Sequence, residues 1–134
     1  MGRRVTLSTG EAGERRAEEF LKKLGYRVLV RNWRSPRDQR DELDLVCCDG
    51  DVMVFVEVKT RSNKALVAGY YTIDRRKKDV LRRAADAYLK SLSPSHRPLT
   101  FRLDVVEIEV GATSADTEIR HFENVPLFPK HYRP

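Results

Sequence analysis

Two apolar runs joined by a tight-turn signal constrain the fold of this chain more than any other feature. The run Val52–Lys59 is rich in β-branched and aromatic residues and predicts a strand that is buried on both faces. The run Glu42–Cys48 predicts a second strand, and Asp49-Gly50 between the two is typical of a two-residue hairpin turn. We therefore expect an antiparallel hairpin within the sheet.

The length of the hairpin turn decides which side chains share a face. Counting outward from a two-residue turn places Asp44 opposite Phe55 and Glu42 opposite Glu57. A three-residue turn would instead move Asp44 and Glu42 to the face opposite Glu57. With the tight turn, one face carries Glu42, Asp44, Glu57 and Lys59.

Carboxylates crowded on one face repel one another, and like charges opposite each other destabilise a sheet. Lys59 can neutralise only one of them, so either a hard divalent cation or a raised carboxyl pKa is needed to compensate. A lone Glu-x-Lys on a strand is commonplace and usually structural. Its combination with acids across a hairpin, on a face that is otherwise apolar, favours a metal site with a lysine beside it.

The composition is that of one globular domain. The chain has 134 residues, of which 40% are hydrophobic and 34% charged. We predict a single domain over residues 1–134, with a basic, mobile start at 1–8 and a tail at 129–134. No apolar run approaches the length needed to cross a bilayer, and no signal-peptide segment follows the first residues. A cytoplasmic protein without membrane contact is expected.

The cysteines and histidines exclude several kinds of site. Cys47 and Cys48 are adjacent, so they point to opposite faces of a strand and offer neither a disulfide framework nor a zinc Cys-x-x-Cys motif. The three histidines show no ligand spacing, and the chain has neither a glycine-rich phosphate loop nor a Gly-x-Ser-x-Gly elbow. Zinc, nucleotide and serine-hydrolase sites are therefore not expected.

The charge distribution favours an anionic partner. The formal net charge is +6 and the sequence pI is near 9.5. Nearly the whole excess lies in residues 75–83. A charged helix face is usually just solvated, yet this one carries a single sign and suits a phosphate backbone. Its basic residues are Arg75, Arg76, Lys77, Lys78, Arg82 and Arg83.

Helical periodicity and chain breakers predict the remaining elements. Their order predicts a mixed α/β fold in which helices cover a central sheet. Trp33 either stacks on a nucleic-acid base or packs on a helix, and packing is favoured. The elements are a helix from a capping box at Ser8 to Gly25, a strand at 26–30, a basic loop at 31–40, a helix capped by Thr72, and strands at 99–110 and 118–122.

Helical periodicity places two charged side chains near the inward faces of their helices. Extending the apolar stripe of the first helix backward from Ala17 reaches Glu14. This acid is either a solvated charge favoured by the helix dipole or a group aimed at the strand acids, and the pattern leaves both open. Counting back from Leu81 places Lys77 near the inward edge of the second helix.

Two motifs are hard to obtain by chance: Glu-Leu-Asp-Leu-Val at 42–46 and Phe-Val-Glu-Val-Lys-Thr-Arg at 55–61. They occur with Gly13-Glu14-x-x-Ala17-x-x-Phe20-Leu21, Gly25-Tyr26, Arg31-Asn32-Trp33-Arg34, the 74–89 helix with Lys77, and Arg102-Leu103-Asp104-Val105-Val106. Together these motifs resemble the YraN family of small bacterial proteins over nearly the whole chain.

That family is grouped with the restriction-endonuclease-like fold, alongside archaeal Holliday-junction resolvases, and its members are mostly described as uncharacterised or as predicted nucleases. The resemblance implies a three-layer α/β/α domain with a central mixed sheet of about five strands. It carries the superfamily signature, Asp then Glu-x-Lys, onto Asp44, Glu57 and Lys59, with Glu14 in the position of a helix-borne acid. The functional interpretation of Glu14 is thereby favoured.

One departure from the family pattern bears on the site. The family usually has Gly-Glu-Ile-Asp-Leu, whereas this chain has Asp-Glu-Leu-Asp-Leu at 41–45 and a longer loop at 37–40. Asp41 adds negative charge at the entrance of the cluster and removes backbone freedom. Either the metal geometry is weakened or the longer loop absorbs the change.

The resulting hypothesis is an endonuclease that hydrolyses phosphodiester bonds in branched or otherwise structured DNA. Asp44, Glu57 and the Val58 carbonyl are expected to hold Mg²⁺ or Mn²⁺, with Glu14 on a second ion or on the first through water. Lys59 would orient or deprotonate the attacking water. Glu42 is a supporting acid. Phosphate contacts are assigned to Arg31, Arg34, Arg61, Lys77 and the other cations of the basic helix.

The alternative is a non-catalytic nucleic-acid-binding module that keeps the nuclease-like fold, and a protein-interaction domain is a third hypothesis. RNA is not excluded as a partner. Resolvase-like enzymes often act as two-fold pairs across a junction, so a homodimer is also considered.

Overall fold

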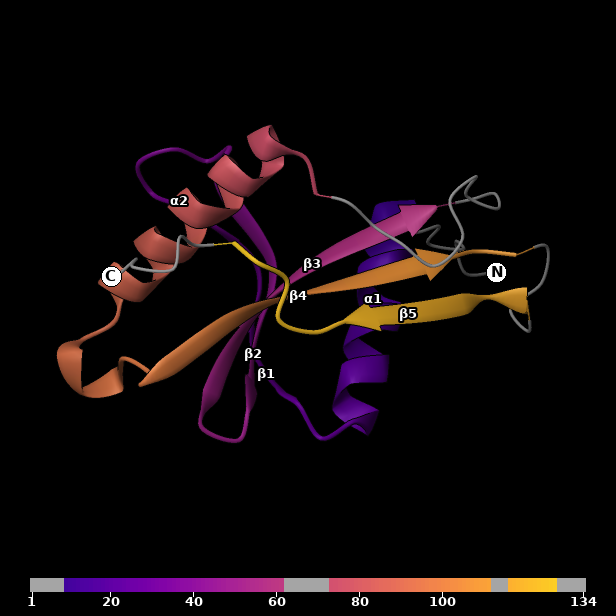
Figure 1. Ribbon diagram of the computed structural model, residues 1–134, viewed down its shortest axis with the longest axis horizontal. Helices are drawn as coiled ribbons and strands as arrows, with labels where there is room; N and C mark the ends of the chain where they lie inside the picture. Colours follow the sequence, from indigo (N-terminus) through magenta and orange to yellow (C-terminus); the bar gives the residue numbers. More distant parts are fainter. Residues whose placement is uncertain (1–8, 62–72, 112–115, 128–134) are drawn as a thin grey trace, which may run out of the picture.

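The computed structural model describes residues 9–61, 73–111 and 116–127. Within them the predicted order of helix, three strands, helix and two strands is confirmed (Figure 1). A 3₁₀ turn at Pro94–His96 follows the second helix. The elements are α1 Thr9–Lys23, β1 Arg27–Arg34, β2 Glu42–Asp49, β3 Val52–Arg61, α2 Arg75–Ser91, β4 Thr100–Glu109 and β5 Glu118–Phe122.

The strands form one mixed sheet in the order β1-β2-β3-β4-β5. β3 and β4 run parallel and every other neighbouring pair is antiparallel. The helices pack on opposite faces, since Ala17 of α1 clusters with Val54 whereas Leu81 of α2 clusters with Phe55 (Figure 1). This three-layer arrangement confirms the predicted α/β class and is consistent with a restriction-endonuclease-like fold.

The register of the β2–β3 hairpin differs from the predicted one by two residues. Phe55 pairs with Val46 rather than with Asp44, because the turn occupies residues 50–51. A shift of two residues leaves Asp44 and Glu57 on the same face of the sheet. Continuing the observed register places Asp44 beside Glu57, which brings these two acids closer than predicted.

β1 is longer than predicted. The polar, basic composition predicts a loop from residue 31, yet β1 continues to Arg34 by pairing with β2. Because β1 is an edge strand, its side chains can be polar while its backbone still pairs with β2. Trp33, in the extension, packs edge-to-face on Tyr88 with ring centroids 5.3 Å apart, which confirms its structural role.

α2 begins at Arg75. Asp74 is its N-cap and accepts a hydrogen bond from the Lys77 backbone N–H at 2.8 Å. The predicted caps Ser8 and Thr72 lie outside the described residues, as do the predicted basic start and tail. Among the described residues, no helix has the length and apolar character required to span a membrane.

Candidate metal centre

Asp44 and Glu57 meet at the end of the β2–β3 ladder. The last pair of that ladder is Leu45 with Val56. Beyond it, the Asp44 side chain accepts a hydrogen bond from the Val58 backbone N–H at 2.8 Å, and Glu57 lies close enough for the charge of Asp44 to raise its pKa. Asp44 is 8% exposed and Glu57 6% exposed. Two carboxyl groups therefore share one small buried space.

Burial and mutual repulsion alter how this pair titrates. Burial, followed by the charge of Asp44, raises the pKa of Glu57 to about 7. Burial also raises the pKa of Asp44, against the opposing effects of the Val58 hydrogen bond and the Lys77 charge. Without a cation, ionisation of Asp44 therefore disfavours ionisation of Glu57.

One oxygen of Glu57 has no hydrogen-bond partner among the described residues. Its Oε1 lies 3.3 Å from Lys77 Nζ, whereas its Oε2 is buried and unpaired. A buried carboxylate oxygen without a hydrogen-bond partner costs free energy, and a hard divalent cation bound to that oxygen would offset the cost. The donor atoms of Asp44 and Glu57 therefore fit Mg²⁺ or Mn²⁺.

The pair is not a complete ligand set. Within residues 9–61, 73–111 and 116–127, no three His, Cys, Asp or Glu side chains gather closely enough to hold a metal by themselves. Mg²⁺ commonly binds through one or two carboxylates and fills its other positions with water and substrate phosphate. This arrangement suits a cation that is shared between protein and substrate.

Lys77, rather than Lys59, contacts the acids directly. Lys77 belongs to the first turn of α2 and forms the 3.3 Å ion pair with Glu57. Lys59 is exposed near the end of β3, and its charge lowers the pKa of Glu57 less than Lys77 does. The sequence pattern assigns Lys77 to phosphate binding, although the count back from Leu81 had indicated its inward position. The catalytic role of Lys59 stays a prediction.

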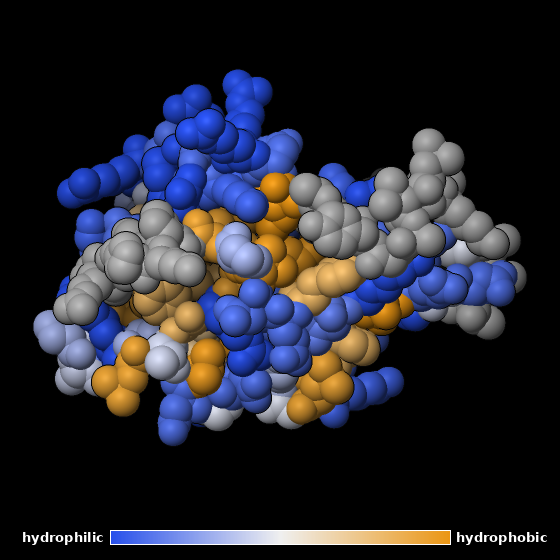
Figure 2. Space-filling model, in the orientation of Figure 1, coloured by the Kyte–Doolittle hydropathy of each residue, from blue (hydrophilic) through white to orange (hydrophobic). Residues whose placement is uncertain are grey.

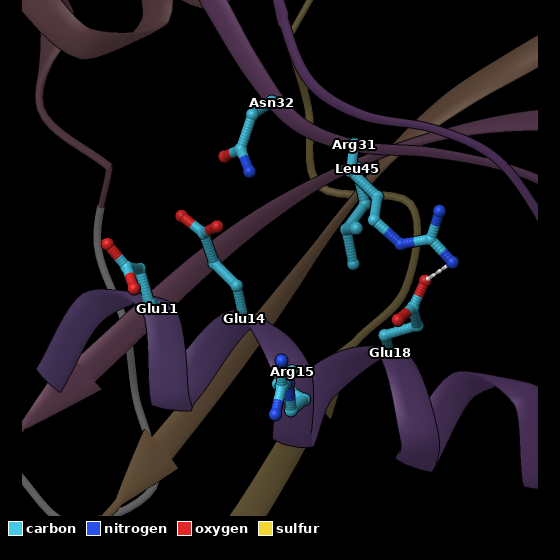
Figure 3. A pocket seen from close by; sticks show the side chains of 7 residues that line it. All are labelled: Glu11, Glu14, Arg15, Glu18, Arg31, Asn32 and Leu45. Atoms are coloured by element: carbon cyan, nitrogen blue, oxygen red, sulfur yellow. Dashed lines mark ion pairs between the residues drawn. The ribbon is translucent and has the colours of Figure 1, made fainter. Parts of the chain in front are cut away.

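Glu14 approaches from α1, on the other side of the sheet. Burial and then the Asp44 charge raise the pKa of Glu14, while a hydrogen bond with Asn32 lowers it. Figure 3 shows Glu14 pointing from α1 toward Asn32 of β1 in a cavity of about 250 Å³. Asn32 is absent from the site predicted by sequence, because nothing in the residue pattern indicates where its side chain points.

Two further predicted residues lie beside the pair. Val58 contributes its N–H to Asp44, and its carbonyl stays a predicted ligand. Glu42 does not face Glu57, because of the register shift. It accepts a hydrogen bond from Arg34 Nε at 3.1 Å.

Most of the predicted phosphate-binding residues have acidic partners in the structure. Among the described residues, no ion pair involves Arg75, Arg76 or Lys78, and the first turn of α2 contains no acid. Apart from the carboxylate of the N-cap Asp74, that turn therefore presents positive charge beside Lys77. The observed pairs are Arg31 with Glu18, Arg34 with Glu42, Arg61 with Glu107, Lys77 with Glu57, Arg82 with Asp79, and Arg83 with Asp41.

Asp41, which replaces the glycine usual in the family, is also paired. Its carboxylate accepts hydrogen bonds from the Arg83 guanidinium at 3.3 Å, and its backbone carbonyl accepts one from Ser35 at 2.9 Å. Asp41 is not among the principal charges that shift the pKa values of Asp44 and Glu57. The added negative charge is thus compensated by Arg83 of α2, and it has no principal effect on the carboxylate pair.

Comparison with known proteins shows the family. A family model described as "Uncharacterised protein family UPF0102" matches residues 13–108. A UPF0102 protein of Symbiobacterium thermophilum is 43% identical over 111 residues, which are 83% of this chain and 86% of that protein. Another from Roseiflexus castenholzii is 40% identical over 122 residues, which are 90% and 92% of the two chains. This chain therefore belongs to the uncharacterised family UPF0102, which confirms its resemblance to the YraN family.

Proposed function

We propose that this protein is a Mg²⁺- or Mn²⁺-dependent endonuclease that hydrolyses phosphodiester bonds in branched or otherwise structured DNA. The observation that carries the proposal is the buried Asp44–Glu57 pair, with its unpaired Glu57 oxygen, directly beside Lys77 in the basic first turn of α2. A cation site next to a phosphate-binding surface suits a substrate whose phosphate oxygens complete the coordination of the metal.

The first turn of α2 is electrostatically suited to phosphate. A helix N-terminus carries partial positive charge and usually attracts acids, yet this turn holds the four cations of residues 75–78. These like charges repel one another and the helix dipole, and a bound anion relieves that repulsion. Figure 2 shows hydrophilic residues gathered over α2.

The position of each residue suggests its role. A divalent cation, when bound, offsets phosphate charge and lowers the pKa of a water molecule. Asp44 and Glu57 would hold that cation, and the Val58 N–H fixes the orientation of the Asp44 carboxylate. Lys77 would pair with a phosphate oxygen once Glu57 is engaged. Lys59 would orient or deprotonate the attacking water, or offset charge on the phosphorane.

A second candidate is a nucleic-acid-binding module that cuts nothing. The Lys77–Glu57 ion pair favours it, because this pair already neutralises one acid without a metal. In that case the basic turn of α2 would still bind phosphates, and the acids would serve only to place Lys77.

A cleavage assay separates the two candidates. The labelled substrates are DNA duplex, single strand, flap and four-way junction, together with an RNA duplex, each with Mg²⁺, Mn²⁺ or EDTA. Asp44→Asn and Lys59→Ala are compared with wild type, and Asp51→Asn, exposed in the turn of the same hairpin, is the matched control.

The nuclease predicts metal-dependent cutting by wild type and D51N. It predicts a loss of roughly 100-fold or more in D44N and in K59A. Binding without cutting in every metal would contradict the nuclease and favour the binding module.

A further inference from the structure

Asn32 has an unusual backbone for a residue within a strand. It lies in β1 with φ of +51°, the left-handed region that few residues other than glycine adopt. Its neighbours Arg31 and Trp33 remain paired with Leu45 and Leu43 of β2. Such a conformation persists only where the surroundings stabilise it, and it occurs frequently at functional sites.

The facing part of β2 is irregular as well. Leu45 packs in the apolar cluster on the α1 side, whereas Leu43 packs in the cluster on the α2 side. Residues two apart in a regular strand share a face, so the alternation is interrupted around Asp44. Asp44 lies within electrostatic range of both helices: its charge raises the pKa of Glu14 on α1, and the charge of Lys77 on α2 opposes the rise in its own pKa.

The Asn32 side chain is directed at Glu14. In Figure 3 its amide faces the Glu14 carboxylate, and the interaction with Asn32 lowers the pKa of Glu14. Both line the cavity between α1 and β1, with Leu45 as its apolar part. Asp44 directly precedes Leu45 in β2, so the Asn32–Glu14 contact is adjacent to the carboxylate pair.

The backbone of α1 is fixed next to Glu14. A Cβ at Gly13 would lie 1.8 Å from Thr60 Oγ1, so only glycine allows α1 to approach β3 this closely. This packing sets the depth of the helix, but it leaves the rotatable bonds of the Glu14 side chain undetermined. The interaction with the facing Asn32 amide limits that remaining freedom.

We infer that Asn32 is a positioning residue, which orients the Glu14 carboxylate beside Asp44 so that Glu14 can contact, through a water molecule, a cation bound at the Asp44–Glu57 pair. The inference rests on the proposed function, because it assumes that a cation binds to the pair. Groups that orient a metal ligand typically contribute about 10- to 100-fold to metal affinity.

Mn²⁺ binding, measured by electron paramagnetic resonance of the full chain, tests this role without relying on activity. Asn32→Gly removes the amide but tolerates the positive φ, so the fold is retained. Asn124→Gly is the matched control, because Asn124 also has positive φ, +54°, and its backbone N–H binds Asp104 rather than the site acids. Melting curves in EDTA accompany each titration.

The inference predicts that N32G weakens Mn²⁺ binding about 10-fold or more, while N124G leaves it unchanged. Glu14→Gln should weaken binding similarly, and N32G should then add nothing further, because both changes remove the same water-mediated contact. N32G should become saturated only when the Mn²⁺ concentration exceeds its higher dissociation constant.

Three results would overturn it: unchanged Mn²⁺ affinity in N32G, an equal loss in N124G, or a full additional loss from N32G in the E14Q background. If any one of them occurs while D44N abolishes Mn²⁺ binding, the inference fails and the proposed metal site stands. If wild type takes up no Mn²⁺ at all, the proposed function fails and the inference fails with it.

Discussion

At the scale of single residues, two buried acids illustrate how a structural carboxylate differs from a candidate ligand. Asp104 is 0% exposed and receives hydrogen bonds from Arg102, His121 and the Asn124 backbone. Burial alone would raise its pKa, yet these hydrogen bonds hold the pKa of Asp104 below its usual value. Glu57 is similarly buried, but one oxygen is unpaired and its pKa is raised. The difference identifies Glu57, not Asp104, as the acid that needs a further ligand.

The titration of Glu57 predicts how pH affects stability in the absence of metal. Its pKa is raised from 4.5 to about 7, so the protonated form stabilises the fold fully below pH 4.5. That contribution is lost as pH rises through about 7, where burial and Asp44 disfavour the charge. Glu57→Gln removes this loss, and we expect it to stabilise the protein by on the order of 2 kcal/mol at pH 8.

Urea unfolding in EDTA at pH 8 and pH 5 checks this expectation. The gain from E57Q should be present at pH 8 and nearly absent at pH 5. A variant that is less stable than wild type at pH 8 would show that the ion pair with Lys77 outweighs the cost of burial.

At the scale of elements, the sequence predicts those features that follow from local pattern. The strands predicted at 42–48 and 52–59, the common face of Asp44 and Glu57, and the strand at 118–122 could be read from alternation and turn residues. The register of the hairpin could not, because Asp49-Gly50 and Gly50-Asp51 are both acceptable turn pairs. The extension of β1 was also missed, since pairing at an edge overrides the polar composition of residues 31–34.

The position of α1 depends on Gly13. Gly13→Ala would place a Cβ 1.8 Å from Thr60 Oγ1 and force the helix away from β3, so we expect a loss of roughly 1–3 kcal/mol in unfolding free energy. Gly10→Ala is the control on the same helix, because nothing lies within 4 Å of its added Cβ. That change should stabilise by about 0.5–1 kcal/mol. Equal effects of G13A and G10A on the thermal midpoint would refute the close-packing argument.

At the scale of the whole molecule, the candidate site is assembled from both outer layers and the sheet. Asp44 and Glu57 come from neighbouring strands, while Glu14 and Lys77 come from helices on opposite faces. Sequence pattern could place each acid on a face but could not predict the Lys77–Glu57 contact or the orientation of Asn32. Both depend on how the helices pack, which no local pattern specifies.

The distribution of ion pairs predicts which cations bind DNA. Replacing n phosphate-contacting cations should reduce the slope of log affinity on log salt by about 0.9n for duplex DNA. We expect Arg75→Gln with Arg76→Gln to lower that slope by about 2. Arg82→Gln with Lys90→Gln is the matched control on the same helix, because these cations already pair with Asp79 and Asp86. An equal change in both double variants would contradict the assignment of the first turn of α2.

The most direct test of the central claim, that the Asp44–Glu57 pair binds a divalent cation, is calorimetric titration of Mn²⁺ into wild type and D44N, with D51N as control. The account predicts uptake by wild type and D51N with the same affinity, and a loss of at least about 100-fold in D44N. Wild type without measurable uptake, or D44N with unchanged affinity, would contradict it.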